Sequence, residues 1–221
     1  MKLIVSAVTK FSFGLIAVGA LLFVPAGTFA YPGAWRFMGL LFIPMVILGV
    51  LLLVHSPELV AKRLKGKEKE KTQKGVIAFS GLLFPLGFIL SALDFRFGWS
   101  MVSSPLVVFA SLLFLMGYAM YGEVMRENAY LSRTVEVQED QKVISNGLYG
   151  IVRHPMYLAT LFMFLPLPLI LGSFWGLIPF ALYPLGIVCR ILNEEKVLTN
   201  GLVGYAEYKT KVKYRLIPFI W

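Results

Sequence analysis

The chain has 221 residues, of which 58% are hydrophobic and only 15% are charged. A soluble domain of this size needs more polar surface than this composition supplies, so a soluble globular protein is excluded. The net charge of +9 would suggest a nucleic-acid partner in a soluble chain, but here the basic residues flank apolar blocks, and anionic lipid headgroups are the expected partner.

Six apolar blocks follow one another along the chain, and most are long enough to cross a bilayer, which takes about 20 residues. They lie at 11–30, 35–54, 76–93, 105–121, 156–171 and 174–189. The last two are short and are joined only by Gly172 and Ser173, which predicts a tight helical hairpin. Pro166 and Pro168 each remove a backbone donor and should kink the fifth block. We therefore predict an all-α fold, a polytopic transmembrane bundle of about six spans with a C-terminal helical hairpin.

Lysine and arginine residues predict the orientation of this bundle in the membrane. If both termini are cytoplasmic, only Arg36 and Arg96 of the 21 basic residues fall in outer loops. The charge run at 62–71, within the loop 55–75, is then a cytoplasmic anchor rather than a ligand site. We expect both termini and any active site on the cytoplasmic side.

The first apolar block admits a second interpretation. Lys2 and Lys10 precede it, and it ends with Thr28-Phe29-Ala30, which resembles a signal-peptide cleavage site. Because the block is long enough to span, we expect it to be retained, although the charge distribution does not decide the point.

Polar residues are concentrated after the fourth block. We therefore divide the chain into N-terminal spans with their basic loop, 1–122, and a C-terminal region, 123–221, that carries the chemistry. Arg153, His154 and Pro155 stand at the mouth of the fifth block, where Pro155 suits the first turn of a helix and the helix N-terminus favours an anionic group. For Arg153 alone, snorkelling to lipid headgroups is an equally good explanation.

A second polar cluster follows the sixth block. Arg190 and Glu194 are four residues apart and therefore share one face of a helix. A local salt bridge would explain the pair if it stood alone. The short hairpin, however, returns this cluster to the same membrane face as Arg153 and His154, which favours a common site.

These motifs together resemble one family. The chain contains Gly147-x-Tyr149-x-x-x-Arg153-His154-Pro155-x-Tyr157, then the hairpin, Arg190-x-x-x-Glu194-Glu195, Gly204-Tyr205-x-x-Tyr208 and Ile217-Pro218 near its end. This arrangement, which covers about 138–221, is similar to the isoprenylcysteine carboxyl methyltransferases, a family grouped with the phospholipid methyltransferases. The chain departs from the family pattern mildly, with Leu148 in place of a proline and Ala159 in place of a glycine.

The resemblance implies transfer of a methyl group from S-adenosylmethionine to a lipid-like or prenylcysteine-like acceptor, with a cytoplasmic cofactor pocket. It assigns Arg190 to the acceptor and Glu194 to the cofactor, whose ammonium suits a carboxylate. The remaining residues that it assigns to the cofactor are Gln138, Gln141, Lys142, Val143, Ile144, Tyr149, His154, Pro155, Met156 and Tyr157. A carboxylate acceptor is favoured because it needs no base, whereas an amine would need one, from His154 or Glu195.

Other classes are less well supported. Membrane sterol reductases have a similar C-terminal hairpin but bind NADPH. The 2′-phosphate of NADPH requires a cluster of basic residues, and no such cluster is obvious near the hairpin of this chain. A transporter predicts ionisable residues inside the spans, and the blocks contain essentially none. Two histidines and one cysteine, widely separated, predict no metal site. The acceptor, whether a carboxylate, an amine or a thiol, and the oligomeric state are left open.

Overall fold

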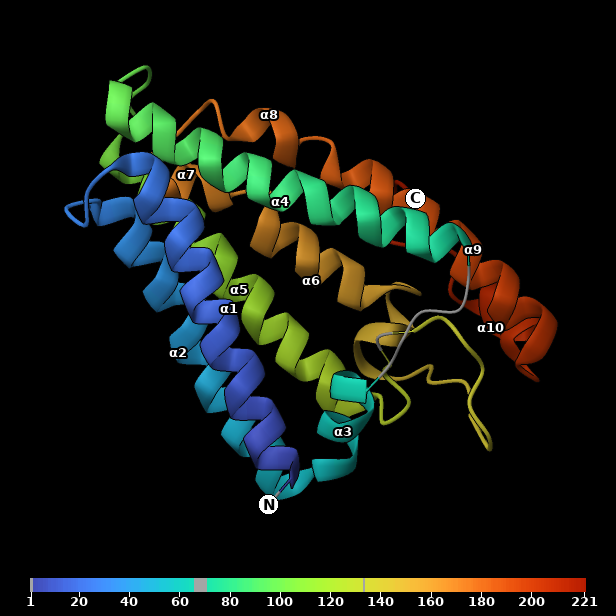
Figure 1. Cartoon of the computed structure of the whole chain (residues 1–221). Coiled ribbons are helices and arrows are strands. Elements are labelled where there is room, and N and C mark those ends of the chain that lie inside the picture. Colours follow the sequence, from blue (N-terminus) through green and yellow to red (C-terminus); the bar gives the residue numbers. More distant parts are fainter. Residues whose placement is uncertain (1, 66–70, 133) are drawn as a thin grey trace.

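The computed structural model describes residues 2–65, 71–132 and 134–221, and these are helical or irregular, with no strand among them (Figure 1). The elements are α1 (Lys2–Ala26), α2 (Pro32–His55), α3 (Pro57–Lys65), α4 (Lys71–Phe97), α5 (Ser104–Glu127), η1 (Gly147–Gly150), α6 (Pro155–Phe164), α7 (Leu167–Leu171), α8 (Leu177–Phe180), α9 (Tyr183–Gly201) and α10 (Tyr205–Lys211). The predicted all-α class is confirmed.

Five helical segments have the length and hydropathy of membrane spans. They are Leu3–Ala26, Pro32–His55, Gln73–Phe97, Ser104–Glu127 and Leu177–Gly201, and a shorter apolar segment runs over Pro155–Leu171. Together they agree with the predicted bundle of about six spans. Part of the predicted charge run, 66–70, lies outside the described residues, whereas the start of the loop forms the short helix α3, which the sequence pattern did not predict.

The hairpin is more broken than two continuous spans. Its first arm is divided into α6 and α7 around Pro166, as the prolines predicted, and the chain turns at Gly172, whose φ is +87°. The second arm is interrupted between α8 and α9, just before Pro184, and α9 then continues to Gly201, twelve residues beyond the predicted block. This extension carries Arg190 and Glu194 on an unbroken helix.

The arrangement of the helices leaves one end of the bundle tightly packed. Figure 1 shows α4 and α9 diverging from α1, α2 and α5, with α6 and the long loop after α5 between the two arms. The packed end contains a hydrophobic core that is rich in aromatic side chains, among them Tyr31, Phe37, Phe114 and Phe180. There Asp94, one residue past the predicted third block, is fully buried, but its carboxylate accepts hydrogen bonds from Ser100 and Ser173 at 2.5 Å each. The polar C-terminal residues lie at the divergent end.

Helix α6 is held against α5 by a close approach at Gly117. A Cβ atom there would lie 2.8 Å from the backbone oxygen of Ala159 and 3.0 Å from the backbone nitrogen of Met163. We expect Gly117→Ala to separate the two helices and to lower stability by about 1–3 kcal/mol, the usual cost of overpacking. Gly122→Ala on the same helix is the matched control, because its Cβ would meet only the end of Leu48 at 3.7 Å. Melting temperatures in detergent compare them, and equal melting temperatures would contradict the packing argument.

Candidate functional site

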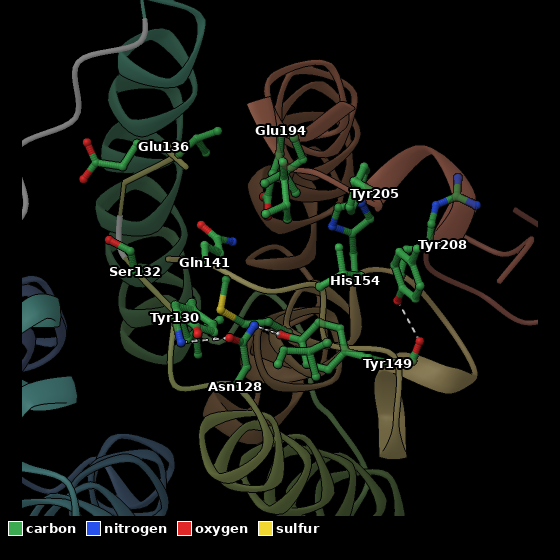
Figure 2. Close-up of a pocket in the computed structure, with 18 of the residues that line it drawn as sticks. Asn128, Tyr130, Ser132, Glu136, Gln141, Tyr149, His154, Glu194, Tyr205 and Tyr208 are labelled. Carbon is green, nitrogen blue, oxygen red and sulfur yellow. Dashed lines mark hydrogen bonds between the residues drawn. The ribbon is translucent and has the colours of Figure 1, made fainter. Parts of the chain in front are cut away.

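A polar cavity lies at the divergent end, between the loop after α5, the start of α6, and helices α9 and α10 (Figure 2). Several of its walls carry tyrosine, carboxylate or amide side chains. The lining residues are Asn128, Tyr130, Leu131, Ser132, Thr134, Val135, Glu136, Gln141, Lys142, Val143, Ile144, Tyr149, Arg153, His154, Met156, Tyr157, Arg190, Glu194, Leu198, Leu202, Tyr205 and Tyr208.

Most of the residues predicted to bind a cofactor meet in this cavity. Ten line it: Gln141, Lys142, Val143, Ile144, Tyr149, His154, Met156, Tyr157, Glu194 and the predicted acceptor residue Arg190. Gln138 and Pro155 do not. Gln138 instead fixes the loop, since its side-chain amide donates to the Tyr130 carbonyl at 2.5 Å and its backbone N–H donates to Gln141 Oε1 at 2.8 Å. Pro155 begins α6. The cofactor roles of all these residues stay predictions.

Tyr157 connects the two residues of the predicted Arg190–Glu194 pair. Its hydroxyl accepts a hydrogen bond from Arg190 Nε at 2.9 Å and donates one to Glu194 Oε2. Tyr157 comes from the first turn of α6, whereas Arg190 and Glu194 come from successive turns of α9. The three side chains therefore form one hydrogen-bonded network across the hairpin. Arg190 and Glu194 do not act only as a local pair within one helix.

The neighbouring Glu195 is a structural anchor. It is 4% exposed and pairs with Arg153 Nε at 2.6 Å and with Arg215 Nε at 2.9 Å. Arg153 also donates to the carbonyl oxygens of Val212 and Lys213, at 2.7 and 2.9 Å. The explanation that Arg153 only snorkels to headgroups is therefore wrong: its side chain is buried and ties the C-terminal segment to α9. Glu195, engaged in this way, is poorly suited to act as a base.

His154 adjoins the same anchor. Its Nε2 atom is buried and lies 3.5 Å from Glu195 Oε1, too long for an ordinary hydrogen bond. Within the described residues it has no closer hydrogen-bond partner. His154 Nε2 therefore faces the Glu195 carboxylate without making a close hydrogen bond to it. No group of three or more His, Cys, Asp or Glu side chains comes together among the described residues.

Sequence reasoning missed one whole wall of the cavity. Residues 128–132 and 134–136 follow the end of α5 without regular structure, so no periodicity marks them. Asn128 Nδ2 donates to the Tyr149 hydroxyl at 2.9 Å, as Figure 2 shows, and this bond joins the missed wall to a predicted residue. The only available signal was the polarity of the segment. Tyr205 and Tyr208 were noted as a motif but were given no role.

An apolar cavity of about 680 Å³ adjoins the polar one. It lies among α2, α3, α4, α5, α6 and α9, and Arg190 is the only charged side chain among the described residues that line it. The two cavities share Ser132, Met156, Tyr157 and Arg190 in their walls. The Tyr157–Arg190 hydrogen bond therefore stands at the boundary between a polar compartment and an apolar one.

Comparison with known proteins bears on this region. Residues 105–202 match the family model described as phospholipid methyltransferase. The match runs from the first residues of α5 to the end of α9, and so includes every lining residue of the polar cavity except Tyr205 and Tyr208. No curated protein matches the chain. The family match confirms the resemblance that the sequence motifs predicted.

Proposed function

We propose that this chain, whose residues 105–202 match the phospholipid methyltransferase family, transfers a methyl group from S-adenosylmethionine to a carboxylate of a lipid-like or prenylcysteine-like acceptor. The observation that carries the proposal is the junction of the polar and apolar cavities at Tyr157 and Arg190. Such a junction suits an enzyme that joins a water-soluble donor to a membrane-borne acceptor.

The residues of the polar cavity fit the donor. S-adenosylmethionine, when bound, supplies an activated methyl group on its sulfonium. Glu194 would hold the ammonium, since a half-buried carboxylate forms strong charge-assisted hydrogen bonds. Tyr149 and Tyr157 offer aromatic faces for the adenosine or the positive charge. The buried hydroxyl of Tyr205, which lacks a hydrogen-bond partner among the described residues, also supports a ligand in this space.

The apolar cavity and Arg190 suit the acceptor. The cavity takes an apolar chain, and the planar guanidinium of Arg190 would align a carboxylate through two parallel hydrogen bonds. A carboxylate is already a nucleophile, so the protein contributes mainly positioning and exclusion of water. A zwitterionic headgroup would need a partner for each charge, and Arg190 offers only the positive one. The pairing of Glu195 with two arginines also argues against Glu195 as the base for amine methylation.

The location of this chemistry is part of the proposal. With the basic residues of the sequence on the cytoplasmic side, the region 123–221 would act there, with both termini on the same side. The N-terminal spans of 1–122 would anchor the enzyme and contribute α2, α3 and α4 to the acceptor cavity.

Transfer of an isotopically labelled methyl group tests the proposal. The purified full chain is incubated with labelled S-adenosylmethionine and, in separate reactions, a prenylated cysteine, a fatty acid or phosphatidylethanolamine. We expect label in the carboxylate acceptors, released as methanol by mild alkali because it is a methyl ester. Alkali-stable label in phosphatidylethanolamine would show amine methylation instead and would overturn the choice of acceptor.

A further inference from the structure

The hydroxyl group of Tyr205 is a buried donor that no described residue of the chain uses. Tyr205 is the first residue of α10, its side chain is 4% exposed, and it lines the polar cavity beside Glu194. Its hydroxyl has no hydrogen-bond partner among the described residues. Because a buried hydroxyl without a partner is costly, such a group in a cavity wall marks a position where a ligand atom is expected.

Tyr208 shows what a hydroxyl used by the fold looks like. Its ring packs against that of Tyr205, with the ring centroids 5.7 Å apart, and both side chains line the same cavity. The Tyr208 hydroxyl, however, donates to the Tyr149 carbonyl at 2.6 Å. Two neighbouring tyrosines of similar burial therefore differ in one respect, which is that only one of them has its hydrogen bond satisfied within the described chain.

The chemistry of the missing partner follows from the charge around Tyr205. Burial raises the pKa of the Tyr205 phenol, and the carboxylates of Glu195 and Glu194 raise it further, so the hydroxyl keeps its proton and acts as a donor. Tyr205 and Glu194 line the same cavity, as Figure 2 shows. A ligand that satisfies both side chains presents a cation to Glu194 and an acceptor to Tyr205.

We propose that Tyr205 recognises the α-carboxylate of S-adenosylmethionine while Glu194 holds the α-ammonium. The inference rests on the proposed function and extends it, since the matched segment 105–202 does not include Tyr205. The ammonium and the carboxylate of an α-amino acid are attached to the same carbon atom. The Glu194 carboxylate can accept a hydrogen bond from the ammonium, and the Tyr205 hydroxyl can donate one to the carboxylate. The lining arginines serve elsewhere, because Arg153 is paired with Glu195 and Arg190 bonds to Tyr157 at the junction with the apolar cavity.

The test compares S-adenosylmethionine with its decarboxylated analogue, which lacks only the α-carboxylate. Calorimetry on the detergent-solubilised full chain measures both affinities for the unmodified protein, for Tyr205→Phe and for Tyr214→Phe. We expect Tyr205→Phe to lower the affinity for S-adenosylmethionine about tenfold or more, as loss of a hydrogen bond to a charged group does. The affinity for the decarboxylated analogue should be unchanged. Tyr214→Phe is the matched control, because Tyr214 packs on Phe219 and does not line the cavity.

Melting temperatures without ligand provide a second measurement. Tyr205→Phe removes no hydrogen bond that the described residues make, so its melting temperature should equal or exceed that of the unmodified chain. Tyr208→Phe loses the bond to Tyr149 and should melt lower.

Three outcomes would overturn the inference. If Tyr205→Phe lowers the affinities for both compounds equally, the hydroxyl contacts the adenosine part instead. If it lowers neither affinity, Tyr205 is purely structural. If the unmodified chain binds neither compound, the proposed function itself fails, and this inference fails with it.

Discussion

Lysine in place of Arg190 is expected to lower the rate of methyl transfer about 100-fold while S-adenosylmethionine binds nearly as before. Arg190 stands at the boundary of the two cavities and donates from Nε to the Tyr157 hydroxyl. Lysine keeps the positive charge but loses the planar pair of donors that would align an acceptor carboxylate. Misplacement of a reacting group by about 1 Å costs on the order of 100-fold in rate. Single-turnover transfer to lipid carboxylates, measured beside cofactor affinity, checks this expectation.

The same substitution at a second arginine controls for any general effect of replacing arginine by lysine. Arg126, at the end of α5, pairs with Glu123 at 2.6 Å on the protein surface and lines neither cavity. An exposed pair of this kind contributes about 0–1 kcal/mol, so Arg126→Lys should leave the rate and the affinity unchanged. Full activity of Arg190→Lys on every accepted substrate would show that Arg190 is structural and only supports Tyr157 and Glu194.

Glutamine in place of Glu194 is expected to lower the affinity for S-adenosylmethionine about 10- to 100-fold, the range for loss of a hydrogen bond between charged groups. The substitution keeps the size of the side chain and an oxygen that can accept the Tyr157 hydroxyl, which donates to Glu194 in the ligand-free chain. Only the negative charge that would meet the cofactor's ammonium is lost. Calorimetry measures the affinity, and the amount of protein inserted in the membrane should be unchanged.

The control for Glu194→Gln is the same change at Glu207. Glu207 lies on α10, forms an exposed pair with Lys211 at 2.8 Å, and is absent from the walls of both cavities. We expect Glu207→Gln to bind S-adenosylmethionine like the unmodified chain. If Glu194→Gln did the same, the assignment of Glu194 to the cofactor would be wrong.

The helical bundle was predictable because membrane spans follow from composition alone. A run of about 20 apolar residues has few other stable arrangements in a bilayer, and prolines interrupt helices wherever they occur. Both signals are local in sequence, so the spans and the break at Pro166 were predicted correctly. The interruption between α8 and α9 was not predicted, although Pro184 at the start of α9 could have suggested it.

The site was only partly predictable because its residues meet through contacts that are distant in sequence. The spacing of Arg190 and Glu194 placed them on one helix face, but no local pattern shows that Tyr157, more than 30 residues earlier, lies between them. The role of Glu195 likewise depends on Arg153 and Arg215, which come from different segments. A sequence pattern can therefore gather candidates, whereas their division into cofactor, acceptor and anchoring groups needs the fold.

The irregular wall and the apolar cavity illustrate the same limit. Residues 128–132 and 134–136 have no periodic pattern, because side-chain bonds such as that from Asn128 to Tyr149 hold them in place rather than a helix. The apolar cavity arises from the divergence of whole helices, and apolar side chains that line a cavity look like those that face lipid.

Titration of the unmodified full chain with S-adenosylmethionine and, separately, with NADPH tests the central claim most directly. A membrane reductase with a similar hairpin would bind NADPH, whose 2′-phosphate needs a cluster of cations. The polar cavity is lined by Glu194, which we propose to hold the ammonium of S-adenosylmethionine. We predict saturable binding of S-adenosylmethionine that weakens in Glu194→Gln, and no saturable binding of NADPH. Saturable binding of NADPH without binding of S-adenosylmethionine would contradict the proposed methyltransferase activity.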